Sequence, residues 1–185
     1  WKKPRGAWGL DVGAIYYYYP GSNASLANGT ALANAKTTSL HTGRVDNTEV
    51  YIGGSWKFLP LKYFHSVNDY FSVPHTGGSG YLDLSANYDL GDGWGINGHL
   101  GHLNFKNFHN GRTSGDYTDW KLGVTKDISG WVFGAAYVGT NAKGSCTPNG
   151  AGLTQPYCFG NDAPGATGTK NAGRDTLILS ISRTF

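Results

Sequence analysis

Apolar residues recur at every second position in eight separate segments of the chain. From Leu82 to Tyr88, for example, leucine, alanine and tyrosine alternate with aspartate, serine and asparagine. A period of two is typical of β-strands, because successive side chains of a strand point to opposite faces of the sheet. The pattern predicts strands at about 8–19, 47–58, 61–69, 80–89, 93–103, 117–127, 130–140 and 174–185.

The connections between these segments alternate in length. Short ones fall around Leu59-Pro60 and at residues 90–93 and 127–130, where Gly, Pro and Asp favour turns. The long connections are residues 20–46, 69–79, 104–116 and 141–173. Short turns at one end and long loops at the other are typical of outer-membrane barrels.

The sequence therefore predicts an all-β protein with a single domain, residues 1–185. Its fold is expected to be an eight-stranded antiparallel up-and-down transmembrane β-barrel with four long extracellular loops and three short periplasmic turns. An even number of strands places both termini at the end with the short turns, which we expect to face the periplasm. The expected location is the bacterial outer membrane.

Composition limits the alternatives. No apolar run approaches the ~18–20 residues of a transmembrane helix, which excludes a helical membrane protein. A net charge of +3 and a pI near 8.8 are too mild for a nucleic-acid-binding surface. No signal peptide is visible at Trp1, so we expect the sequence to begin in the mature chain of an exported protein.

Aromatic rings gather toward the two ends of the apolar face. A sheet that faces acyl chains needs an apolar outer face with aromatic rings at both interfaces. The predicted periplasmic girdle consists of Trp8, Trp56, Phe58, Tyr88, Trp94, Trp131 and Phe185, and the predicted extracellular girdle of Tyr16, Tyr18, Trp120 and Tyr137. The alternative is a soluble core, which has no reason to gather large rings at one rim.

The opposite face carries charged residues and one histidine. The interior of an eight-stranded barrel is just wide enough for side chains to fill, and buried charges must be paired or hydrogen-bonded. We therefore expect a packed polar network inside the barrel. Its predicted members are Asp11, Glu49, Lys57, Lys62, Asp83, His99, Asp119 and Lys121.

The two cysteines, Cys146 and Cys158, fall in the last long connection, which is rich in Gly, Pro and Asn. They have no His or Cys neighbours at metal-ligand spacing. A disulfide formed in an oxidising compartment is the favoured interpretation, and two free thiols are the alternative.

Several segments resemble the TorF-like family, small proteobacterial proteins of unknown function that are assigned to the outer membrane. They include GLDVGAIYYYYP (9–20), EVYIGGSWKFLPLKY (49–63), GYLDLSANYDLGDG (80–93) and DTLILSISRTF (175–185). The resemblance implies an outer-membrane location and offers no catalytic residues. The end of the chain also resembles the C-terminal signal read by the barrel-assembly machinery, from which Arg183 departs.

For function, we expect a structural or partner-binding role through the extracellular loops. The expected partners are outer-membrane lipid, lipopolysaccharide, and a protein or second copy bound through loops or apolar belt; no cofactor, metal or nucleic acid is expected. The alternative is a narrow porin-like channel, with Gly53, Gly101, Gly123 and Gly134 leaving a wet path. A lipid-modifying enzyme is less favoured, because the adjacent His65 and Ser66 would point to opposite faces of a strand.

Overall fold

One antiparallel sheet of eight strands dominates the computed structural model of the chain, which describes residues 8–28, 39–108, 114–142, 157–160 and 169–184. The strands lie in the order β1-β4-β5-β6-β7-β8-β9-β12. Their bounds are β1 Trp8–Tyr18, β4 Asp46–Trp56, β5 Leu59–Ser66, β6 Gly80–Gly91, β7 Trp94–Asn104, β8 Tyr117–Ile128, β9 Trp131–Thr140 and β12 Thr176–Arg183.

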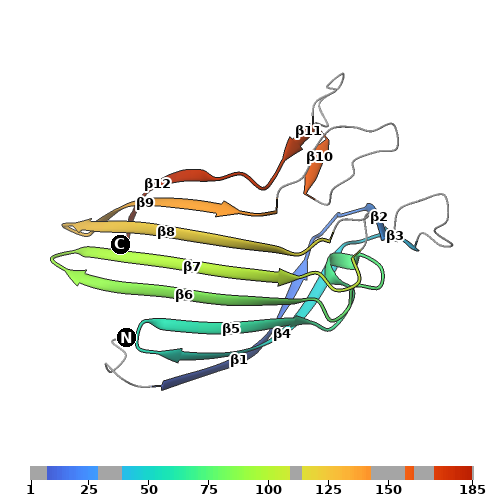
Figure 1. The fold of residues 1–185 in the computed structure, drawn as a ribbon, viewed down its shortest axis with the longest axis horizontal. Helices are drawn as coiled ribbons and strands as arrows, with labels where there is room; N and C mark the ends of the chain where they lie inside the picture. Colours follow the sequence, from blue (N-terminus) through green and yellow to red (C-terminus); the bar gives the residue numbers. More distant parts are fainter. Residues whose placement is uncertain (1–7, 29–38, 109–113, 143–156, 161–168, 185) are drawn as a thin grey trace.

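These strands form a meander in which each pairs with the next of the eight along the chain. Figure 1 shows them running along the long axis of a curved sheet, with short turns at one end and long loops at the other. We call these the turn end and the loop end. The predicted all-β antiparallel sheet of eight strands is confirmed. Among the described residues, the edge strands β1 and β12 do not pair with each other, so closure into a barrel stays a prediction.

Two of the short turns adopt the backbone conformation of tight hairpins. Between β6 and β7, Asp92 and Gly93 have positive φ of 50° and 76°, as a type I′ turn requires. Ser129 and Gly130 do the same between β8 and β9, with φ of 54° and 85°. Such turns fix the register of the paired strands and therefore which side chains share a face.

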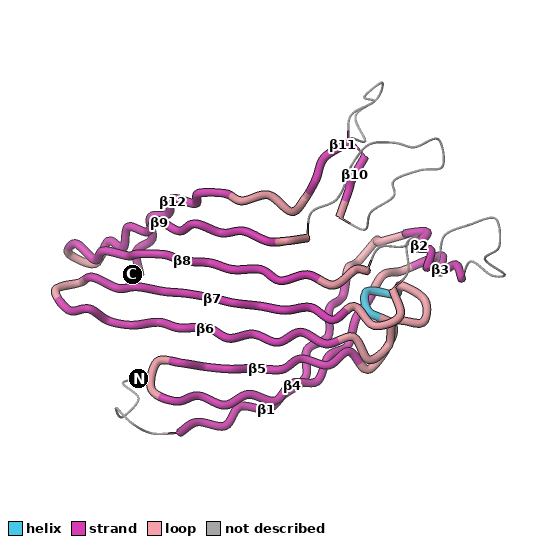
Figure 2. The backbone as a smooth tube through the Cα atoms, in the orientation of Figure 1, coloured by secondary structure: helices cyan, strands magenta, loops and turns pink. Residues whose placement is uncertain are grey.

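The long connections contain short elements that the sequence patterns did not predict. The first holds the hairpin of β2 (Ala24–Asn28) and β3 (Ser39–Gly43), and the last holds β10 (Cys158–Gly160) paired with β11 (Thr169–Asn171). The second contains the 3-10 turn η1 (Tyr70–Ser72), the cyan stretch in Figure 2. In the described part of the chain, no helix is long and apolar enough to cross a membrane.

The apolar residues of the sheet are exposed. Leu10, Leu122 and Leu179 are 78%, 62% and 74% exposed, whereas the described residues include only three buried hydrophobic ones: Leu103, Phe108 and Ala142. We call the side of the sheet with the three leucines the apolar face and the side with the alternate residues the polar face. Apolar surface of this extent marks an interaction surface, because water-soluble domains bury such side chains in a core.

Candidate functional site

A row of six residues crosses the polar face from β1 to β8. The strand register places them side by side, one on each successive strand. They are Asp11, Gly53, Lys62, Asp83, Gly101 and Asp119. The two glycines have no side chains, so that neighbouring side chains can reach across the row.

His99 on β7 joins two carboxylates of this row. Its Nδ1 lies 3.1 Å from Asp83 Oδ1, and its Nε2 lies 2.9 Å from Asp119 Oδ1. The side chains of the three residues are between 21% and 29% exposed. Both ring nitrogens therefore face a carboxylate oxygen, so that His99 bridges Asp83 and Asp119.

Tyr81 and Ser85 on β6 complete the cluster around this histidine. The Tyr81 hydroxyl donates to Asp119 Oδ2 at 2.8 Å, and the Ser85 hydroxyl donates to Asp83 Oδ1 at 2.7 Å. We call Tyr81, Asp83, Ser85, His99 and Asp119 the His99 network. Three of its members were predicted from the alternation of the strands, whereas the tyrosine and the serine were not. Their odd numbers put them in phase with Asp83, and this was the signal by which they could have been found.

A second cluster joins β1 to β5. Lys62 Nζ lies 2.5 Å from Asp11 Oδ2 and 4.9 Å from the centre of the Tyr51 ring, whose hydroxyl donates to Asp11 Oδ1 at 3.3 Å. A Cβ atom at Gly53 would lie 2.7 Å from Lys62 Cγ, closer than side chains tolerate. Glycine at this position therefore allows the Lys62 side chain to extend over β4 and reach Asp11 on β1.

Two further residues of the predicted network lie on the polar face but outside these clusters. Glu49 is buried toward the loop end, where it accepts a hydrogen bond from Asn47 Nδ2 at 2.9 Å. Lys121 is exposed and lies opposite His99 in the register of β7 and β8.

Lys57 does not belong to the predicted polar network. The predicted strand continued to residue 58, but β4 ends at Trp56 and Lys57 turns away with φ of 55°. Its Nζ lies 4.5 Å from the centre of the Trp56 ring. The turn begins before this lysine, so the alternation of the strand no longer decides where its side chain points.

Side chains of neighbouring strands lie close to four glycines of the polar face, those that the channel alternative invoked. A Cβ atom added at any of them would meet a neighbouring side chain at 2.7 Å or less. The pairs are Gly53 with Lys62, Gly101 with Tyr81, Gly123 with Asn97 and Gly134 with Ser180. Side chains from adjacent strands therefore occupy the space that these glycines leave.

Rings of the predicted periplasmic girdle pack against one another at the turn end. Trp8 and Trp56 stack with ring centres 6.0 Å apart, and Phe58 meets Tyr88 edge-on at 5.0 Å. The first pair comes from β1 and β4, and the second from the turn after β4 and from β6, so both pairs lie at the same end of the sheet.

Cations accompany two more rings at the same end. Lys126 Nζ lies 4.8 Å from the centre of the Trp94 ring, and the Arg183 guanidinium lies 5.0 Å from that of Trp131. A cation over an indole face is a stabilising arrangement. Phe185, the last residue assigned to this girdle, lies outside the described residues.

The rings assigned to the extracellular girdle lie near the loop end. Tyr16 and Tyr18 stack at 6.3 Å, and the Arg44 guanidinium lies 5.4 Å from the centre of the Tyr18 ring. A hydrogen bond to Asp46 raises the pKa of Arg44 above its ordinary value. Trp120 lies on the same face of the sheet as Leu122, because it is two residues away on β8. Tyr137 lies on this face as well, because it is the partner of Leu122 in the register of β8 and β9.

The connection after β5 folds into a hydrogen-bonded cap at the loop end, which we define as residues 67–79. Asp69 Oδ1 accepts the backbone N–H groups of Thr76 and Gly77 at 3.0 and 3.1 Å. The Thr76 hydroxyl donates to the carbonyl of Val73 at 2.6 Å, and Thr76 is fully buried. The cap is therefore held by its own polar side chains.

Aromatic rings join the cap to the strands. Tyr70 meets Phe105 edge-on at 5.2 Å, and Phe71 packs against Tyr17 of β1 at 5.4 Å. Burial raises the pKa of the Tyr70 phenol well above its ordinary value. The cap thus connects residues at the ends of β1 and β7.

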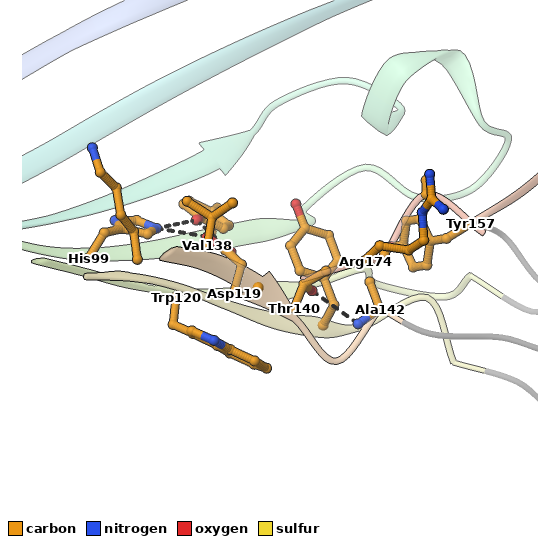
Figure 3. Close-up of a pocket in the computed structure, with 14 residues that line it drawn as sticks. His99, Asp119, Trp120, Val138, Thr140, Ala142, Tyr157 and Arg174 are labelled. Atoms are coloured by element: carbon orange, nitrogen blue, oxygen red, sulfur yellow. Dashed lines mark hydrogen bonds and ion pairs between the residues drawn. The ribbon is translucent and has the colours of Figure 1, made fainter. Parts of the chain in front are cut away.

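A pocket of about 480 Å³ lies between the His99 network and the last connection. Its lining includes Asp119, Lys121 and Val138 from the sheet and Tyr157 and Arg174 from the connection. Figure 3 shows His99 at one end of the pocket and Tyr157 and Arg174 at the other, while Trp120 points to the opposite side of the sheet.

Close backbone packing holds the last connection over β9. A Cβ atom at Gly173 would overlap the carbonyl oxygen of Ala142, so only glycine permits this approach. The Tyr157 hydroxyl donates to the carbonyl of Gly115, and its ring meets Tyr117 edge-on at 5.4 Å. Burial raises the pKa of the Tyr157 phenol.

The His99 network has the residue types of a hydrolase triad but not its hydrogen bonds. The Ser85 hydroxyl donates to Asp83, and His99 Nδ1 lies further away at 3.2 Å. A serine nucleophile needs its proton directed at the histidine. The described residues include no group of three His, Cys, Asp or Glu side chains that could hold a metal ion.

The predicted disulfide lies partly outside the described structure. Cys146 falls outside the described residues, and only the backbone of Cys158 is described, at the start of β10. The pairing of the two cysteines stays a prediction.

The geometry defines a class of protein: an antiparallel β-meander with one exposed apolar face and one polar face closed by side-chain networks. The chain belongs to the family Gcw_chp, described as a bacterial protein of unknown function, whose family model matches residues 1–185. Neither a curated protein nor a solved structure matches the chain.

Proposed function

We propose that the chain is the membrane domain of an outer-membrane β-barrel that presents its long loops outside the cell for a structural or partner-binding role. The observation that carries the proposal is the exposure of the apolar face, where Leu10, Leu122 and Leu179 are all more than 60% exposed. Exposure to water costs about 25 cal/mol per Å² of apolar surface, a cost that acyl chains remove. Lipid is therefore the surrounding that this face fits.

Closure of the sheet is the second part of the proposal. An open sheet edge cannot face hydrocarbon, because its backbone N–H and C=O groups would have no partners. Pairing of β1 with β12 satisfies both edges. The leucines of β1 and β12 lie at even-numbered positions of β1 and odd-numbered positions of β12, so Val12 has to lie beside an odd-numbered residue of β12. Leu179 and Ile181, near the middle of that strand, are the pairings we propose.

Cross-linking tests this closure. In a chain with Cys146→Ser and Cys158→Ser, we replace Val12 by cysteine together with either Leu179 or Ile181. One of the two pairs should form a disulfide within a single chain. The matched control is Val12→Cys with Ile178→Cys, which should not form a disulfide, because Ile178 points to the opposite face of the sheet from Leu179. Disulfides that form only between chains would contradict closure.

The two aromatic girdles support a location in the outer membrane. Aromatic rings with nearby Lys or Arg are favoured at membrane interfaces, where a long cationic side chain reaches the headgroups. Arg183 over Trp131 explains how a cation can stand at the rim of an apolar face. The resemblance to the TorF-like family supports the same location.

The role assigned to the loops rests on the polar face. The His99 network and the Lys62–Asp11 pair fill the middle of this face, and the cap covers its loop end. A filled interior favours an anchor for loops. A narrow channel is the second candidate, favoured by a further hollow of about 420 Å³ near the turn end, lined by residues that include Asn87 and Asp127.

Fractionation of Gram-negative cells that express the exported chain tests the location. The protein should remain in the outer-membrane fraction after a carbonate wash and should run faster on a gel when unheated. Recovery in the carbonate-soluble fraction would contradict the proposal.

Planar-bilayer recording separates anchor from channel. The anchor predicts no unitary conductance from the wild-type protein. Replacement of His99 by alanine in a second protein controls for sensitivity, because removal of the central side chain should open a small conductance. Steady conductance in the wild type would favour the channel.

A further inference from the structure

We propose that a hollow in the apolar face binds one acyl chain of an anionic phospholipid, whose headgroup meets Lys126 at the turn end. The inference rests on the proposed function, because it takes lipid as the surrounding of the sheet, and it adds one specific lipid site to that surface. The hollow has a volume of about 370 Å³ and lies over β6, β7 and β8, in the middle of the strand order.

Two small residues form the floor of the hollow. Ala86 on β6 and Gly98 on β7 are partners in the strand register, and Gly98 is also the partner of Leu122 on β8. A Cβ atom at Gly98 would meet only the carbonyl oxygen of Lys121, at 3.7 Å. The backbone therefore leaves open space on the apolar face at this point.

Large apolar side chains form the walls. Phe58 and Tyr88 meet edge-on at 5.0 Å and line the hollow together with Ile96 and Leu122. These four side chains are between 39% and 62% exposed. Among the described residues that line the hollow, none is charged. A polar ligand would find few partners there, whereas a hydrocarbon chain needs none.

Lys126 determines which kind of lipid fits. It is the register partner of Trp94, and its Nζ lies 4.8 Å from the centre of the Trp94 ring. This Nζ donates one hydrogen bond, to the carbonyl of Asp92 at 2.6 Å, so that donors of its ammonium group remain for a phosphate. Among the described residues, Lys126 forms no ion pair. A cation at a membrane surface attracts anionic headgroups.

The strand register connects the cation to the hollow. Lys126 lies four residues after Leu122 on β8, which is about 13 Å along the strand at about 3.3 Å per residue. Val124 and its register partner Ile96 lie between them on the same face. A lipid with its phosphate at Lys126 can therefore extend its chain over this apolar row and into the hollow.

Native mass spectrometry tests the proposal on the full chain in a neutral detergent. Phosphatidylglycerol, which is anionic, is compared with phosphatidylcholine of the same acyl chains. One phosphatidylglycerol molecule should remain bound to each protein molecule. Phosphatidylcholine should bind about fivefold more weakly, as expected for the loss of attraction to one lysine.

Gly98→Leu should reduce the binding of both lipids at least about tenfold, because its side chain fills the hollow. Gly54→Leu is the matched control and should bind as the wild type does. It adds the same side chain to the same face on β4, where a Cβ would meet only the carbonyl oxygen of Gly9 at 3.9 Å. An unchanged β-sheet circular dichroism spectrum establishes that both variants are folded.

Lys126→Gln keeps the hollow intact and tests the headgroup contact separately. It should weaken phosphatidylglycerol binding about fivefold and leave phosphatidylcholine binding unchanged. Absence of a bound lipid, equal binding of the two lipids by the wild type, or equal effects of Gly98→Leu and Gly54→Leu would overturn the proposal. Lipid-free dimers that Gly98→Leu dissociates would overturn it as well and assign the hollow to a second copy of the chain.

The outcome is distinct from that of the proposed function. A protein that remains in the outer-membrane fraction but retains no lipid loses only this site. Recovery in the carbonate-soluble fraction would remove both the location and the site.

Discussion

The backbone of Gly101 lies directly beneath the ring of Tyr81, so closely that a Cβ atom at Gly101 would overlap the Tyr81 hydroxyl. The same Cβ would lie 2.7 Å from Asp119 Oδ2, which accepts the hydrogen bond of that hydroxyl. The absence of one side chain on β7 therefore allows β6 and β8 to be bridged across it.

Gly101→Ala should lower the free energy of unfolding by about 1–3 kcal/mol, because an overpacked methyl group has to displace the tyrosine. The control is Gly98→Ala on the same strand, where a Cβ would meet only the Lys121 carbonyl at an ordinary 3.7 Å. Urea unfolding in detergent, followed by tryptophan fluorescence, measures both. Equal effects of the two substitutions would show that the close approach does not matter.

His99→Leu should destabilise the protein by about 2–4 kcal/mol, because it leaves Asp83 and Asp119 without their shared partner. Adding Asp83→Asn should recover part of this loss, since the amide removes one unpaired charge.

The control for this substitution is His102→Leu. His102 is exposed and contacts only the Thr118 hydroxyl, at 3.0 Å, among the interactions described for its ring. Its replacement should change the free energy of unfolding by less than about 0.5 kcal/mol. A large loss at His102 with none at His99 would contradict the role of the network.

Leu122→Arg distinguishes lipid from water outside the sheet. Leu122 lies in the middle of β8, and an arginine at the midplane of a lipid-facing wall costs about 2–4 kcal/mol, whereas on a water-exposed surface it costs within about 0.5 kcal/mol. Leu90→Arg at the turn end is the control, with an expected cost of about 0–1 kcal/mol near the interface. The free energy of unfolding of both variants in lipid vesicles, relative to that of the wild type, is the quantity to compare.

High pH should loosen the loop end. Burial raises the pKa of Tyr70 and Tyr157 above the ordinary value of 10.0, so these phenols stay protonated in the folded protein after unfolded phenols have ionised. Their contribution to stability is therefore complete below about pH 10 and declines above it. Absorbance at about 295 nm should show late-ionising tyrosines, which Tyr70→Phe and Tyr157→Phe each reduce. A titration unchanged by both substitutions would contradict this.

The strands could be predicted from sequence because each is long enough for alternation to repeat. β6 runs from Gly80 to Gly91, and its predicted segment, 80–89, differs only at the turn. The segment of β9 is apolar on both faces, and the small residues Gly134 and Ala136 only favoured the other face for its rings. The strands β10 and β11, of three residues each, contain too little alternation to be recognised.

The candidate site was predicted only in part. Asp83, His99 and Asp119 are conspicuous as polar residues in strand phase, and the structure brings them together. The cap could not be predicted, because its side chains bond within an irregular connection that has no period. The pocket depends on Gly173 and Arg174. These residues lie in the connection before β12, so the pairing of the eight strands does not determine their positions.

Spin labels on β8 test the central claim, that the apolar face meets acyl chains, most directly. In a chain with both native cysteines replaced by serine, a label at Leu122→Cys or Val124→Cys should collide more with oxygen than with a water-soluble nickel chelate in lipid vesicles. A label at Lys121→Cys should not show this preference. If the labels at 122 and 124 are instead as accessible to the nickel chelate as a label in a loop, the apolar face meets water and the account is wrong.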